Sequence, residues 1–189
     1  DDDLIGCAFA AVVDEQTMAP DTFYVMTWKR GSQSSGGLLA EEGIKLLRVE
    51  GAAGFADSLY GVLWDGETTP SVSVLDSHLG DDAGWTVGVT YTATIHQHTE
   101  SGQIDLTVTR DSDAAILWQT SMVDPSPLPA GRVGFYNQTQ PLTYYSARDL
   151  SGFLPDRAYR LTVTSGTGGL TDTEGQPIDG NADGTAEDG

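Results

Sequence analysis

The alternation of apolar and polar side chains between residues 89 and 109 constrains the possible folds of this chain most strongly. Apolar side chains recur at every second position from Val89 to Ile95 and again from Ile104 to Val108. The positions between them hold mainly threonine, together with His96 and Asp105. Successive side chains of a strand point to opposite faces, so this pattern predicts two strands, each with one buried and one solvated face. The polar segment Thr99–Gly102 joins them into a hairpin.

Short apolar runs separated by polar turns continue along the chain, and no segment of useful length has helical periodicity. Further strands are predicted at Leu4–Val13, Phe23–Trp28, Gly43–Val49, Leu59–Trp64, Val72–Leu75, Ala115–Trp118, Val133–Tyr136, Leu142–Ala147 and Ala158–Thr164. About ten short strands of this kind predict an all-β fold, an antiparallel β-sandwich. We expect its core to contain Phe9, Val25, Leu106, Val108, Val133 and Phe135.

The strongly acidic composition restricts the partners that the chain can have. It contains 28 acidic and 9 basic residues, with a formal net charge of −19 at pH 7. This charge disfavours nucleic acid and anionic membrane surfaces as partners. No apolar stretch approaches the roughly 20 residues that membrane insertion requires. A solvated acidic surface explains most of the carboxylates, and we expect a few clusters of them to bind Ca²⁺ instead.

Two groups of adjacent acids are the first candidates for calcium binding. Asp1, Asp2 and Asp3 precede the first predicted strand, where their mutual repulsion costs stability unless a cation is bound. Ca²⁺ takes 6–8 oxygen ligands, so a loop must supply others, and Asp81 and Asp82 are the candidates. The alternative is that all of these are solvated loop acids.

The C-terminal tail holds the most specific local motif. Asp179, Asn181 and Asp183 occupy positions 1, 3 and 5 of the pattern D-x-[DN]-x-[DN]-G, with glycine at position 6. Oxygens at these positions converge on one ion in EF-hand-type loops, and Glu187 at position 9 can ligate directly or through water. The bidentate acid of position 12 would lie one residue beyond Gly189. A Gly/Asp-rich linker that binds nothing is the alternative.

Catalytic patterns are weak, and we expect the protein not to be an enzyme. The sequence has neither a G-x-S-x-G elbow nor the closely spaced acids of a jelly-roll glycosidase. His96 and His98 would project to one face of a strand, but a zinc site needs a third ligand, so two solvated histidines are the favoured reading. The single cysteine, Cys7, excludes an internal disulfide framework and is expected to be buried.

The four tryptophans, Trp28, Trp64, Trp85 and Trp118, could stack on sugar rings. Aromatic residues in apolar strands more often belong to the core. Trp85, next to the Asp81–Asp82 loop, is the candidate for a surface position.

Several segments, in order over the first 150 residues, resemble the C-terminal lectin-like domain of thrombospondins. They are Asp1–Gly6 (DDDLIG), Phe23–Lys29 (FYVMTWK), Gly43–Leu46, Leu63–Trp64, Gly84–Trp85, Ser101–Ile104 and Gly131–Phe135 (GRVGF). The resemblance implies a jelly roll of the legume-lectin or concanavalin A type, calcium dependence, and strands that precede the acidic segment in a longer exported protein. The last forty residues are instead similar to the end of bacterial immunoglobulin-like repeats.

The sequence therefore predicts a thrombospondin-like β-sandwich in residues 1–150, followed in 151–189 by a partial immunoglobulin-like strand and an acidic tail. The function implied is calcium-dependent adhesion or matrix attachment, outside the cell or on its surface, as part of a larger modular protein. The partner would be an extracellular protein or a glycan. A carbohydrate-binding module attached to an exported hydrolase is the alternative, and a structural spacer that binds only calcium is a third possibility.

Overall fold

The computed structural model describes residues 4–13, 20–35, 38–50, 71–137, 143–149 and 157–165, and these contain strands and turns but no helix. No helix in this part of the chain could therefore cross a membrane. The strands are β1 (Leu4–Val13), β2 (Pro20–Lys29), β3 (Gln33–Ser35), β4 (Leu38–Ala40), β5 (Gly43–Glu50), β6 (Val72–Leu79), β7 (Thr90–His98), β8 (Gln103–Arg110), β9 (Ala115–Val123), β10 (Arg132–Asn137), β11 (Thr143–Asp149) and β12 (Arg157–Ser165). The predicted strand Leu59–Trp64 lies outside the described residues.

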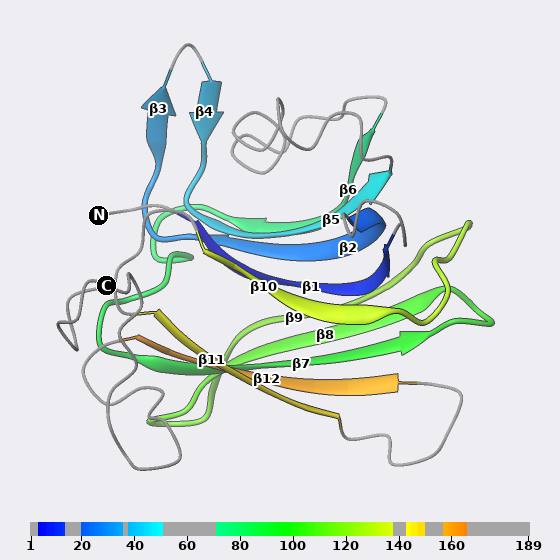
Figure 1. Ribbon diagram of the computed structural model, residues 1–189. Coiled ribbons are helices and arrows are strands. Elements are labelled where there is room, and N and C mark those ends of the chain that lie inside the picture. Colours follow the sequence, from blue (N-terminus) through cyan, green and yellow to red (C-terminus); the bar gives the residue numbers. More distant parts are fainter. Residues whose placement is uncertain are drawn as a thin grey trace, which may run out of the picture.

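Ten of these strands form two five-stranded sheets that lie one above the other (Figure 1). The first sheet has the order β10-β1-β2-β5-β6 and the second the order β11-β12-β7-β8-β9. The pairs within both sheets are antiparallel. The short hairpin β3–β4 projects from the body of the molecule. The predicted antiparallel β-sandwich is confirmed, and its jelly-roll connectivity stays a prediction.

The hairpin predicted from alternation is present as β7 and β8. Tyr91, Ala93 and Ile95 of β7 are buried, as are Ile104 and Leu106 of β8. Ile95 lies opposite Leu106 in the register, so these side chains share the inner face. The alternation therefore predicted both the pairing and the side of the sheet that faces the core.

The first sheet buries apolar side chains on both of its faces. On β2, Tyr24, Met26 and Trp28 belong to the core between the sheets. Phe23 and Val25 point the other way, into a second buried cluster on the outer face. A strand that is buried on both sides has a continuous apolar sequence, which explains why this strand does not alternate.

The predicted core is correct except at its last member. Phe9, Val25, Leu106 and Val108 are at most 1% exposed, and Val133 packs partly buried against the main core. The prediction for Phe135 is wrong, because 46% of its surface is exposed.

Phe135 is exposed because β10 is an edge strand of the first sheet. Its ring stacks on Tyr145 of β11, the edge strand of the second sheet, with ring centroids 4.7 Å apart. At the opposite edge of the sandwich, Thr120 of β9 donates a hydrogen bond to Asp76 of β6. Each side of the sandwich therefore has a contact that joins the two sheets.

The strand predicted at Ala158–Thr164 is confirmed as β12, which lies between β11 and β7 in the second sheet (Figure 1). Its register pairs Leu161 with Ala93 of β7 and with Ala147 of β11. The division of the chain into units at residue 150 stays a prediction.

Candidate functional site

The structure describes only part of the predicted calcium-binding set. Asp81 and Asp82 are exposed in the turn that follows β6, and Asp82 has a positive φ of 73°. The other predicted ligands lie outside the described residues: Asp1, Asp2, Asp3, Asp179, Asn181, Asp183 and Glu187. Within the described ranges, no group of three or more His, Cys, Asp or Glu residues could hold a metal ion.

The turn that carries Asp81 and Asp82 is fixed to one end of the first sheet. The Gly80 amide donates to the Glu42 carbonyl oxygen at 3.1 Å, and the Gly84 amide donates to the Glu42 carboxylate at 3.0 Å. Gly84 lies so close to the backbone that an added Cβ would be 2.0 Å from the carbonyl oxygen of Arg30. A larger residue at this position would displace the turn from the strand end.

This strand end is also where β1 begins. Leu4, the first residue of β1, pairs with Lys29 at the end of β2. The buried ammonium of Lys29 donates a hydrogen bond to Gln33 at 2.9 Å. The start of β1 therefore lies at the same end of the first sheet as the Asp81–Asp82 turn.

Carboxylate oxygens are the donors that Ca²⁺ prefers, so the chemistry of Asp81 and Asp82 fits this ion. Two carboxylates alone fall short of the six to eight oxygens that it requires. These two residues could therefore supply only part of the ligands of a calcium ion, and the others would have to come from elsewhere in the chain or from water.

The prediction that Trp85 lies on the surface is wrong, because only 5% of it is exposed. The turn folds back onto the sheet, where the indole nitrogen of Trp28 donates to the Ala83 carbonyl oxygen at 2.8 Å. This brings Trp85 into the main core, and the Arg30 guanidinium lies 5.7 Å from its ring centroid. Trp28 and Trp118 are also buried, as expected of core residues, and Trp64 lies outside the described ranges.

His96 and His98 lie on the outer face of β7, with ring centroids 6.3 Å apart. His98 Nε2 is 3.3 Å from a carboxylate oxygen of Asp105 on β8. Hydrogen bonds from Ser121 and Gln103, together with His98, lower the pKa of Asp105. The two histidines therefore belong to a polar network on a solvated face, which agrees with the favoured reading of this pair.

The cysteine is buried as predicted, with 2% of its surface exposed. Burial raises the pKa of the Cys7 thiol to about 12. Because only the thiolate is strongly nucleophilic, we expect Cys7 to be unreactive in the folded protein.

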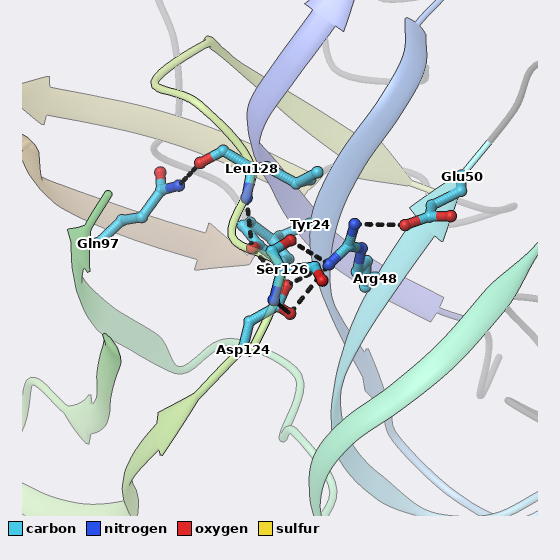
Figure 2. A network of polar contacts seen from close by, with 7 residues as sticks. All are labelled: Tyr24, Arg48, Glu50, Gln97, Asp124, Ser126 and Leu128. Carbon is cyan, nitrogen blue, oxygen red and sulfur yellow. Dashed lines mark hydrogen bonds and ion pairs between the residues drawn. The ribbon is translucent and has the colours of Figure 1, made fainter. Parts of the chain in front are cut away.

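A buried polar network between the first sheet and the connection that follows β9 is the main feature that the sequence did not indicate (Figure 2). Asp124 follows β9 and is only 2% exposed. Its carboxylate accepts hydrogen bonds from the Tyr24 hydroxyl at 2.7 Å, from Arg48 Nη1 at 2.7 and 2.9 Å, and from the Ser126 amide at 2.8 Å. Tyr24 and Arg48 come from the first sheet, so the network ties that sheet to the connection that leaves the second.

The same network fixes the backbone of the connection from β9 to β10. The Leu128 amide donates to the Tyr24 hydroxyl at 2.9 Å, and Gln97 of β7 donates to the Leu128 carbonyl oxygen at 2.7 Å (Figure 2). The guanidinium of Arg48 also contacts the Ser126 carbonyl oxygen and the carboxylate of Glu50. The contacts with Ser126 and Leu128 hold a chain segment that lies between strands β9 and β10.

The ionic state of this network follows from its contacts. Burial alone would raise the pKa of Asp124, but the hydrogen bonds from Tyr24 and the Ser126 amide and the charge of Arg48 lower it overall. Burial likewise acts to lower the pKa of Arg48, and the Asp124 carboxylate reverses this effect. Burial and the neighbouring Asp124 raise the pKa of Tyr24. At neutral pH the network is thus a carboxylate–guanidinium pair with a protonated tyrosine.

A pocket of about 400 Å³ opens beside this network. Its lining combines strand residues of the first sheet with the turn after β9: Arg48, Glu50, Ser71, Ser73, Leu75, Asp124, Pro125 and Ser126. The only sequence signal for it was a charged residue, Arg48, in phase with the apolar inward positions Ile44 and Leu46 of β5.

Comparison with known protein families gives a match that covers most of the chain. The family model of the thrombospondin C-terminal region matches residues 1–151. A comparison with curated proteins finds no match.

Proposed function

Because the chain belongs to the thrombospondin C-terminal family, we propose that it is a calcium-binding, non-enzymatic adhesion module of a larger modular protein. Membership of this family implies an extracellular protein. Adhesion or matrix attachment is the role that we assign to it, with an extracellular protein or glycan as partner. The net charge of −19 supports a partner that is neither nucleic acid nor an anionic membrane.

The observation that carries the calcium proposal is that the start of β1, at Leu4, and the Asp81–Asp82 turn lie at the same end of the first sheet. The Asp81–Asp82 turn is bound to Glu42 and packs on Arg30, and Leu4 pairs with the neighbouring Lys29. Asp1, Asp2 and Asp3 directly precede Leu4 in the sequence. We propose that carboxylates from both segments bind one Ca²⁺ and that the remaining ligands are backbone carbonyl groups or water.

A bound calcium ion would join the start of β1 to the β6–β7 connection. Ligands that bind the folded state alone stabilise it in proportion to the logarithm of their concentration. Calcium would therefore raise the melting temperature of the protein.

The test is isothermal titration of calcium into the variant Asp81→Ala with Asp82→Ala. We expect at least a tenfold loss of affinity and a melting temperature that no longer rises in calcium. The matched control is Glu100→Ala with Asp111→Ala, because these two acids are also exposed in turns. Unchanged affinity and an unchanged melting temperature in calcium would place the site elsewhere.

The C-terminal motif is proposed as a second calcium site, for which Asp179, Asn181, Asp183 and Glu187 are the candidate ligands. Titration of Asp179→Ala with Asp183→Ala, in a version of the protein extended beyond Gly189, should lose one calcium ion per chain. If the stoichiometry stays the same, the tail is a linker.

A further inference from the structure

We propose that the pocket beside the Arg48–Asp124 pair binds a neutral, hydroxyl-rich ligand of the size of one sugar ring. This inference names a chemical class for the ligand of the adhesion module, and its biological role rests on the proposed function. The binding chemistry itself depends only on the residues that line the pocket.

The floor of the pocket is held in place before any ligand arrives. Asp124 is buried and accepts hydrogen bonds from Tyr24, Arg48 and the Ser126 amide, which fixes the Pro125–Ser126 turn. On the opposite wall, the Glu50 amide donates to the Ser71 carbonyl oxygen at 2.8 Å. Preorganised walls reduce the entropy that is lost when a ligand binds.

The accessible polar groups of the pocket suit hydroxyl groups. The Glu50 side chain is 52% exposed, and it contacts Arg48 through Oε1. Ser73 and Ser126 are exposed on the two walls. A carboxylate accepts hydrogen bonds, and a serine hydroxyl both donates and accepts them, as sugar hydroxyls do.

The remaining lining supplies apolar contact. Leu75 is half-buried and Pro125 is exposed, one on each side of the pocket. Sugar rings carry C–H groups between their hydroxyls, so a mixed lining of this kind matches a pyranose better than a purely polar or a purely apolar molecule. Ligand sites generally combine apolar walls with a few fixed polar groups.

The charge of the pocket excludes anions. Among the described residues of the lining, the single cation is Arg48, which is paired with both Asp124 and Glu50, so these three side chains have a net charge of about −1. A phosphate or sulfate group would meet unpaired negative charge and a guanidinium that two carboxylates already neutralise. A neutral ligand avoids this repulsion.

The volume sets the size of the ligand. About 400 Å³ lies at the lower end of the roughly 300–1,000 Å³ that is typical of small-molecule sites. One pyranose ring fits this space, whereas a longer glycan would extend into solvent. We therefore expect dissociation constants in the millimolar range for single sugars.

The experiment is a set of amide chemical-shift titrations on the full chain with glucose, galactose, mannose and N-acetylglucosamine. At least one of these should shift the amides of residues 71–75 and 124–126. The source of the ligand is then tested by comparing the free sugar with its methyl glycoside, since a residue linked within a glycan carries a substituted anomeric oxygen and a free monosaccharide does not. Equal or tighter binding of the glycoside assigns the pocket to glycans, and binding of the free sugar alone assigns it to a free monosaccharide.

Two variants test the assignment of the site. Glu50→Ala should weaken binding at least fivefold by removing an acceptor, and Ser73→Trp should abolish it by filling the pocket. Glu100→Ala, in the exposed turn between β7 and β8, is the matched control. Melting temperatures close to that of the parent protein show that each variant is folded.

Three results would overturn the proposal: no shift with any sugar, equal binding by the Glu50→Ala variant, or preferential binding of glucose 6-sulfate or lysine methyl ester. The titrations are repeated in calcium and in EDTA, and with Asp81→Ala plus Asp82→Ala. A protein that binds sugar but not calcium would contradict the proposed function alone. A protein that binds calcium but no sugar would contradict this inference alone.

Discussion

Replacing Asp124 with asparagine tests whether the buried network holds the two sheets together. The carboxylate accepts four hydrogen bonds, one from Tyr24, two from Arg48 and one from the Ser126 amide. Asparagine keeps one acceptor oxygen and turns a donor toward groups that are themselves donors. It also removes the charge that balances the guanidinium of Arg48.

The expected cost can be worked out from these contacts. Removing one partner of a buried ion pair typically costs about 3–5 kcal/mol. Arg48 keeps its contacts with Glu50 and the Ser126 carbonyl oxygen, so the lower end applies and we expect about 3 kcal/mol. For a domain of this size, that corresponds to a fall of roughly 6–12 °C in the melting temperature.

Urea denaturation followed by tryptophan fluorescence measures this change, because Trp28, Trp85 and Trp118 are buried in the folded protein. Tyr24→Phe, which leaves the Leu128 amide without a partner and removes one of the two hydrogen bonds to Asp124 Oδ2, should cost about 1–3 kcal/mol. The double variant Asp124→Asn with Tyr24→Phe should lose less unfolding free energy than the sum of the two single losses, because the two residues share one hydrogen bond. Asp113→Asn, in the exposed pair with Arg110, is the control and should show no measurable change.

The pH dependence gives an independent check. The pKa of Asp124 is lower in the folded protein than the unfolded value of about 3.9, so its contribution to stability is present above that pH. This contribution is lost as the pH falls through the folded pKa. The difference in unfolding free energy between the parent protein and Asp124→Asn should therefore become smaller below about pH 4. If Asp124→Asn lost less than about 1 kcal/mol of unfolding free energy at pH 7, or if the difference did not change with pH, the reasoning would be refuted.

Two further predictions concern the backbone and the thiol. Gly102→Ala should destabilise the protein by more than about 2 kcal/mol, since φ is 74° and the new Cβ would lie 2.1 Å from the Asp124 carbonyl oxygen. Gly88→Ala, with φ of 76° but open space around it, should cost only about 1 kcal/mol, and equal losses in urea denaturation would contradict the role of the close approach. Cys7, whose pKa is about 12, should not react with a disulfide reagent at pH 8 until urea unfolds the protein, and rapid labelling of the native state would show that it is accessible.

Periodicity predicted the parts of the fold that depend on neighbours in the sequence. The β7–β8 hairpin follows from alternation, because each apolar side chain of one strand meets its counterpart on the next. Periodicity also places Phe135 on the inward side of β10. It does not tell which strand lies at the edge of a sheet, and this is why Phe135 was wrongly predicted to be buried.

The Arg48–Asp124 pair could not be predicted from the sequence for a different reason. The two residues are 76 positions apart and meet only after both sheets have formed and stacked. Arg48 alone gave a signal, as a charge in phase with the inward residues Ile44 and Leu46 of β5. Trp85 was misplaced for a similar reason, because the fold of its turn depends on contacts with Glu42, Arg30 and Trp28 from other segments.

The position of β12 determines when the second sheet can be completed during synthesis. β7 is made early, but its neighbour on one side is β12, and four strands separate the two along the chain. Until the residues up to Ser165 have been synthesised, that edge of β7 has exposed amide and carbonyl groups that can pair with other chains. Pairing between strands so distant in sequence also slows folding. A truncated protein ending at residue 151, the limit of the family match, would lack β12 and would therefore be prone to aggregate.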